Sequence, residues 1–102
     1  MVLLDFSMFP LDKGESLSAF VARSLDLIDR SGVEYRCHAM GTTLEGELDE
    51  VFDVVRQCFQ AMATDCDRIE CSIKIDYRKD RSGRLQGKVA SVEQKLGRPV
   101  KK

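Results

Sequence analysis

Apolar and polar residues alternate along four segments of the chain, which is the pattern of strands with two different faces. The segments are residues 2–9, 33–38, 42–45 and 68–77. The last alternates most regularly: its apolar face carries Ile69, Cys71, Ile73, Ile75 and Tyr77, and its polar face carries Glu70, Ser72, Lys74 and Asp76. The pattern therefore predicts four strands.

Between these segments, apolar residues recur every three or four positions, as on one face of a helix. The first helix is predicted to begin near Ser16, a suitable N-cap, and to close at Gly32. The second follows Gly46 and carries three acids in its first turn, where the helix dipole favours negative charge. A last helix ends at Gly97, shortly before a proline.

The order of elements is β-α-β-β-α-β with a C-terminal helix, which is the ferredoxin-like split β-α-β arrangement of the α+β class. A chain of 102 residues is expected to form one domain, residues 1–102. The sheet face without helices would carry Leu3 and Phe9 among polar side chains. Such a face either lies in solvent or packs against another subunit. The two apolar residues favour the second, so we expect a dimer or a dimer of dimers.

Charge and hydropathy narrow the choice of partners. The 16 basic and 17 acidic residues give a net charge of −1, which offers no electrostatic footprint for nucleic acid. No stretch approaches membrane-spanning length, and no charged segment precedes an apolar run at the N-terminus. We therefore expect a cytoplasmic protein that binds neither nucleic acid nor membrane.

The four cysteines carry no recognisable metal or disulfide framework. They lie at positions 37, 58, 66 and 71 without a C-x-x-C pair, and the lone His38 cannot complete a zinc site of usual spacing. Most lie on strand or helix patterns, where free cysteine behaves as a small buried hydrophobe. We predict reduced thiols, no metal and no required cofactor.

Several motifs, taken in order, resemble the small thiamine-binding protein family, single-domain relatives of the tandem thiamine/hydroxymethylpyrimidine-binding proteins. They are Ser7 and Pro10 at the end of the first strand, Met-Gly-Thr-Thr-Leu-Glu-Gly-Glu at 40–47, Asp-Glu-Val at 49–51, and Ser-Ile-Lys-Ile-Asp-Tyr-Arg at 72–78. The resemblance implies a ferredoxin-like fold, assembly through the sheets, and non-catalytic binding of a thiamine-type molecule. One departure is Ala39, where many members have proline.

The residues on these motifs suit such a ligand. Thiamine offers an aminopyrimidine edge that needs donors and acceptors, which short hydroxyls supply, and a cationic thiazolium that a carboxylate would attract. A tyrosine could stack on a ring, and a lysine would suit a phosphorylated form. The candidate ligand-binding residues, expected near a subunit junction, are Ser7, Tyr35, Thr42, Thr43, Glu45, Ser72 and Lys74.

Two other classes of function remain open. One is an ACT-like regulatory module that binds a different small effector. The other is a small ferredoxin-like enzyme that uses His38 or Glu45 for proton transfer, which requires a group with a tuned pKa beside a pocket. The sequence shows no residue that would orient His38, so we assign no catalytic residue. Whether a bound ligand is delivered, stored or sensed is equally open.

Overall fold

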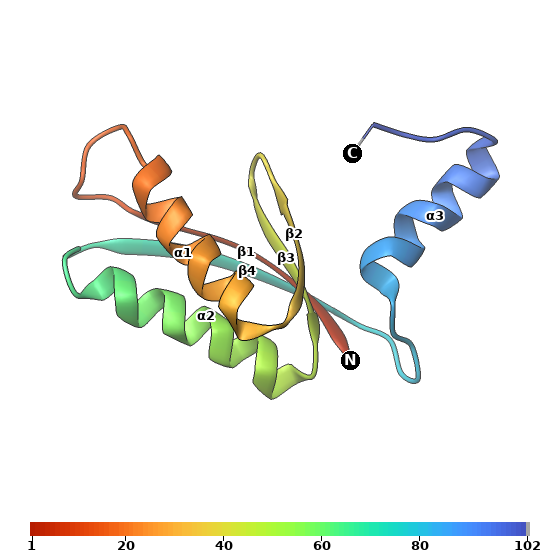
Figure 1. Ribbon diagram of the computed structural model, residues 1–102, viewed down its shortest axis with the longest axis horizontal. Helices are drawn as coiled ribbons and strands as arrows, with labels where there is room; N and C mark the ends of the chain where they lie inside the picture. The colour runs from red at the N-terminus through yellow and green to blue at the C-terminus, as the bar shows by residue number, and fades with distance from the viewer. Residues whose placement is uncertain (102) are drawn as a thin grey trace.

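The computed structural model describes residues 1–101, which form one antiparallel sheet and three helices (Figure 1). The elements are β1 (Val2–Pro10), α1 (Ser18–Ser31), β2 (Glu34–His38), β3 (Gly41–Gly46), α2 (Leu48–Ala63), β4 (Ile69–Tyr77) and α3 (Arg84–Leu96). The sheet order is β2-β3-β1-β4. The predicted ferredoxin-like α+β fold is thus confirmed. Only the start of α1 differs clearly: Leu17 occupies the N-cap and makes no side-chain capping bond, so the Ser16 prediction was wrong.

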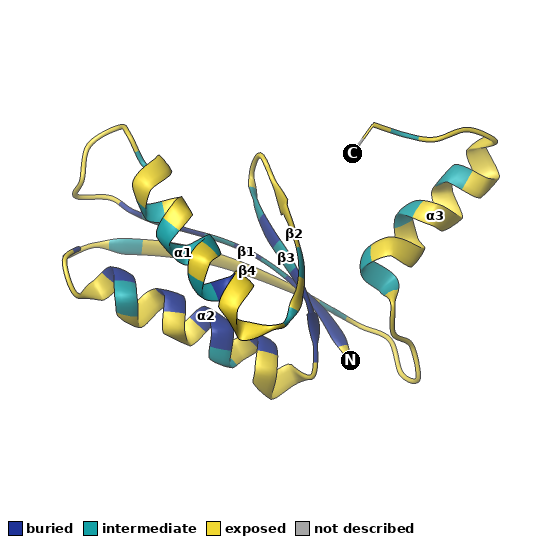
Figure 2. Cartoon of the chain, in the orientation of Figure 1, coloured by how far each residue is buried: buried dark blue, intermediate teal, exposed yellow. Residues whose placement is uncertain are grey.

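The core lies between the sheet and the α1–α2 layer (Figure 2). Strand alternation places the even-numbered residues of β1 on this face, and Leu4 is fully buried opposite Leu44 of β3. Val51 and Met62 of α2 cover the core on the helix side, with at most 1% of their surface exposed. The alternation of the sequence therefore located the inner face of β1 correctly.

The two strands of the β2–β3 hairpin are shorter than β1, with which β3 pairs. Pairing between β1 and β3 ends at Phe6 and Thr42, whereas β1 pairs with β4 as far as Pro10 and Ile69. The chain turns back at Ala39–Met40. Residues 7–10 of β1 therefore have a strand neighbour on one side only.

Helix α3 begins over the sheet face that was predicted to carry no helix. The Glu45 carboxylate of β3 accepts hydrogen bonds from the first backbone amides of α3, at 2.9 Å from Arg84 N and 3.4 Å from Leu85 N. Arg84 and Lys88 both bind Asp76 of β4. Leu3 is consequently only 8% exposed within one chain, so it does not need another subunit to cover it. That part of our expectation was wrong.

Beyond its first turn α3 leaves the body of the molecule (Figure 1). None of its 13 residues, all within the described part of the chain, is buried. In residues 1–101 no helix is long and apolar enough to span a membrane.

Candidate functional site

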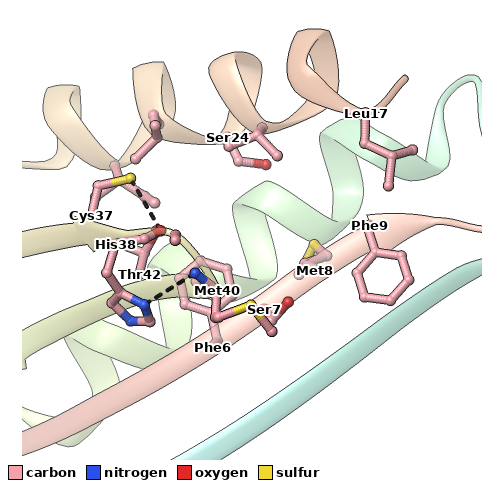
Figure 3. A pocket seen from close by; sticks show the side chains of 15 residues that line it. Phe6, Ser7, Met8, Phe9, Leu17, Ser24, Cys37, His38, Met40 and Thr42 are labelled. Atoms are coloured by element: carbon pink, nitrogen blue, oxygen red, sulfur yellow. Dashed lines mark hydrogen bonds between the residues drawn. The ribbon is translucent and has the colours of Figure 1, made fainter. Parts of the chain in front are cut away.

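A small pocket lies where β3 begins and the hairpin turns away from β1 (Figure 3). Its volume is about 180 Å³. Its walls come from the end of β1, from α1 with the residue before it, and from the hairpin tip, and they are mostly apolar. We call it the tip pocket; the residues used below are Phe6, Ser7, Met8, Phe9, Ser24, His38, Met40, Gly41 and Thr42.

The backbone of β1 supplies one wall of the tip pocket. Leu11 N–H donates to Arg68 O at 2.8 Å, which marks odd-numbered β1 residues as those whose amides face β4. The N–H and C=O of Met8 therefore face the other way, into the space that β3 has vacated. The backbone of Pro10 also faces this side, and because proline has no N–H it leaves no unpaired donor there. Met8 thus presents a paired donor and acceptor to the pocket.

Three side-chain hydroxyls complete the polar surface of the pocket. They belong to Ser7 of β1, Ser24 of α1 and Thr42 of β3 (Figure 3). Within the described residues none of these three hydroxyls has a hydrogen-bond partner, and none is a fully buried polar atom that lacks one. They are therefore free to bind a molecule that enters the pocket.

The rim of the pocket is held by His38. Met40 N–H donates to its Nδ1 at 3.3 Å, so Nε2 carries the hydrogen that is donated to Asp5 Oδ1 at 2.8 Å. Thr43 Oγ1 donates to the same carboxylate oxygen at 2.7 Å. Asp5 thus orients His38, contrary to the expectation from sequence. Both imidazole nitrogens are engaged, which disfavours His38 as a general base in this arrangement.

The charge state of Asp5 follows from these contacts. Partial burial raises its pKa, but the hydrogen bonds from His38 and Thr43, with the electrostatic attraction of the His38 ring and of Lys74, outweigh burial and hold the pKa below its usual value. Asp5 is therefore a carboxylate at neutral pH. It anchors the hairpin from the outer face of the sheet.

The structure divides the predicted ligand-binding residues among different places. Ser7 and Thr42 line the tip pocket. Thr43 and Lys74 lie beside Asp5 on the outer face, next to a second, more open groove of about 470 Å³. The seven residues therefore do not form one cluster.

The other three predicted residues are engaged elsewhere or lie apart. Tyr35 donates from its hydroxyl to Asp29 of α1 at 3.0 Å, on the helix side of the sheet. Glu45 holds the start of α3, as described above. Ser72 is exposed on β4, opposite Ser7 in the register.

Sequence reasoning missed Ser24, the backbone of Met8 and the partnership of Asp5 with His38. Ser24 has a detectable signal, since it lies three residues after Val21 and four before Ile28 on the inner stripe of α1. The other two depend on register and on where β3 begins, which the sequence pattern does not specify.

The cysteines differ in their surroundings. Cys58 and Cys66 are buried, Cys71 is half-buried, and Cys37 is exposed, so the prediction of a buried Cys37 was wrong. Burial raises the pKa of the Cys58 thiol. Among residues 1–101, no three potential ligands come together as a metal site.

A ferredoxin-like domain with a small, mostly apolar pocket and free hydroxyls belongs to the class of small α+β ligand-binding folds. Its sequence identifies the family directly: the profile of the thiamine-binding protein family matches residues 4–93, and the chain belongs to that family.

Relatives and solved structures agree with this assignment. The UPF0045 protein MJ1052 of Methanocaldococcus jannaschii is 33% identical over 91 residues, covering 89% of this chain and 91% of that protein. Its crystal structure superposes with a TM-score of 0.84 at 32% identity, covering 91% and 96% of the two chains. A Bacillus cereus domain of unknown function has a TM-score of 0.76 at 37% identity, with 86% of each chain covered.

A Thermotoga maritima protein, named as a candidate for thiamine biosynthesis/salvage, has a TM-score of 0.78 at 23% identity, covering 89% and 97% of the two chains. At that identity the likeness concerns the fold alone.

Proposed function

We propose that this protein binds thiamine, or its hydroxymethylpyrimidine moiety, without transforming it, and that the pyrimidine ring enters the tip pocket. The observation that carries the proposal is the combination of apolar walls with an unpaired strand edge and three free hydroxyls. Membership of the thiamine-binding protein family supports the choice of ligand.

The pocket volume favours one ring rather than the whole of thiamine. Drug-sized ligands occupy pockets of roughly 300–1,000 Å³. The tip pocket, at about 180 Å³, is smaller than that range. In our proposal the pyrimidine enters and the thiazolium stays at the mouth, near the rim formed by His38 and Met40.

The polar groups match an aminopyrimidine edge. An amino group next to a ring nitrogen presents a donor beside an acceptor, which is the complement of the C=O and N–H that Met8 directs into the pocket. Thr42 and Ser7 can then donate or accept at the remaining ring nitrogen. Phe6 and Met40 provide an aromatic face and a thioether, both of which pack well against a flat ring.

Catalysis has no support from the same geometry. The one histidine is held through both nitrogens by Asp5 and the Met40 amide. Binding for supply, storage or sensing therefore explains the site better than proton transfer does.

Two adjacent threonines provide a matched test. Thr42 lines the pocket, whereas Thr43 points to the outer face and bonds Asp5. In the parent protein, ligand at about 100 times its dissociation constant stabilises the fold by about 2.7 kcal/mol per site. That corresponds to a rise of roughly 10 °C or more in melting temperature.

Thr42→Val should weaken hydroxymethylpyrimidine binding by about fivefold to tenfold in calorimetry, since one hydrogen bond contributes about 1 kcal/mol. Thr43→Val should leave the affinity within about twofold. The reverse result would move the site to the outer face beside Asp5. No melting shift with thiamine, its phosphates or hydroxymethylpyrimidine at millimolar concentration would reject the proposed ligand.

A further inference from the structure

A groove lies on the outer face of the sheet, between α3 and the strands β1, β2 and β3. Its volume is about 550 Å³. That is within the range of roughly 300–1,000 Å³ in which small organic ligands bind. We call it the α3 groove; its lining includes Leu3, Arg36, Thr43, Leu85, Val89 and Lys101.

The helix side of the α3 groove is apolar. Leu85 and Val89 lie one turn apart on α3 and are its half-buried apolar residues, so this stripe of the helix faces the groove. Leu3 of β1 adds apolar surface from the sheet and is only 8% exposed. Val100 extends the apolar lining, because its N–H donates to Glu93 Oε2 at 2.9 Å and turns the C-terminal segment back along α3. The groove can therefore enclose an apolar body between helix and sheet.

The charges that line the α3 groove are mainly positive. Arg36 and Lys101 line it and have no hydrogen-bond or ion-pair partner among residues 1–101. Arg84 also lines it and is fixed in place by its ion pair with Asp76. Among the described residues of the lining, Glu93 is the only carboxylate, and a backbone amide already engages it. The groove thus offers cations that await an anion.

The neighbouring groove of about 470 Å³ on the same face lacks this excess of positive charge. Its two lysines are matched by two aspartates, since Lys88 binds Asp76 and Lys74 lies opposite Asp5 in the register. Of the two grooves, the α3 groove alone combines unpaired cations with an apolar wall.

We infer that the α3 groove binds a small organic anion with an apolar body, of the class of a medium-chain carboxylate. Arg36 lies opposite Thr43 in the register of the hairpin, and its guanidinium binds the anionic group, since the fork of this side chain matches the two oxygens of a carboxylate. The apolar body packs along Leu85 and Val89. The site is separate from the tip pocket, with which it shares only Cys37 and His38 at the end of β2.

A fluorescent aromatic anion, anilinonaphthalene sulfonate, provides the first test on the full-length protein. Its fluorescence should rise when it binds to the parent. Octanoate should displace it at a concentration about threefold to fivefold lower than octanol does, because only octanoate carries the charge that Arg36 attracts. Acetate, which has the charge without the apolar body, should not displace it at the concentration at which octanoate does. No rise in fluorescence, or equal displacement by octanoate and octanol, would overturn the inference.

Two pairs of substitutions locate the charge and the apolar wall. Arg36→Gln should weaken octanoate binding by about threefold to fivefold, as expected for an exposed ion pair, and should leave octanol binding unchanged. Arg78→Gln makes the same charge change at another exposed arginine without a partner and should change neither. Val89→Ser should weaken octanoate and octanol alike, by about threefold. Val92→Ser, at a position outside the groove that is 56% exposed, should weaken neither. Equal effects of the two arginine substitutions would show that net charge, and not the groove, attracts the anion.

Amide hydrogen exchange with octanoate bound identifies the occupied site. Exchange should slow in α3, because the bound anion joins this helix to the sheet. Slowing confined to α1 and the hairpin tip would place the anion in the tip pocket. Loss of dye binding as the protein concentration rises would show that a second copy of the chain fills the groove. Either of these two results would contradict the inference.

Discussion

Gly41 is the residue on which the shape of the tip pocket most directly depends. It starts β3 beside β1, and a Cβ added there would lie 2.6 Å from the backbone oxygen of Phe6 and 3.3 Å from its carbonyl carbon. Carbon atoms in contact normally keep about 3.5–4.0 Å between them. Gly41→Ala must therefore move the hairpin tip away from β1 by several tenths of an ångström, in backbone that cannot yield easily.

The expected cost of Gly41→Ala is that of overpacking, about 1–3 kcal/mol. In a domain of this size each kcal/mol lowers the melting temperature by roughly 4–8 °C. The substitution should also weaken hydroxymethylpyrimidine binding, because it displaces the wall that carries Thr42. Urea titration and thermal melting at one protein concentration measure the first effect, and calorimetry measures the second.

Gly87 provides the matched control. It lies inside α3, and nothing lies within 4 Å of a Cβ added there. Gly87→Ala should be neutral or stabilise the helix by about 0.5–1 kcal/mol, from the lower conformational entropy of alanine. If Gly41→Ala is as stable as Gly87→Ala, the close approach of β1 to the hairpin is not a constraint, and the reasoning about the pocket wall fails.

Three further predictions follow from single contacts. Glu45→Gln should increase the rate of amide hydrogen exchange in α3 far more than elsewhere, since a hydrogen bond from the first amides of α3 to a charged acceptor contributes about 1.5–3 kcal/mol. An equal increase in exchange rate throughout the chain would contradict this. Because the pKa of Asp5 is lowered in the folded state, its contribution is present above the unfolded value of about 3.9 and is lost as the pH falls through the folded value. Stability of the parent should therefore fall more steeply below about pH 4 than that of Asp5→Asn in acid titrations followed by circular dichroism. Iodoacetamide should modify Cys37 first and Cys58 only on unfolding, which peptide mass spectrometry would show.

Much of the architecture was predictable from sequence because it depends on local periodicity. Alternation and helical spacing identified all seven elements and the inner face of β1, since burying one face of each element leaves few arrangements of the chain. The acids at the start of α2 were equally readable; in the structure Glu47 is the N-cap of this helix, and Glu50 Oε1 accepts from Glu47 N–H at 3.1 Å. Each of these features depends on residues close together in the chain.

The candidate site was decided by tertiary structure. Whether a hydroxyl is free depends on strand length and register: the hydroxyl of Thr42 remains free where the pairing of β1 with β3 stops, while that of its neighbour Thr43 meets Asp5, 38 residues away in the chain. Glu45 reads in sequence as a ligand carboxylate, and only the folded chain shows that it caps α3. Local sequence sets which face a side chain takes, but the partner on that face comes from distant segments, and tertiary packing alone brings those segments together.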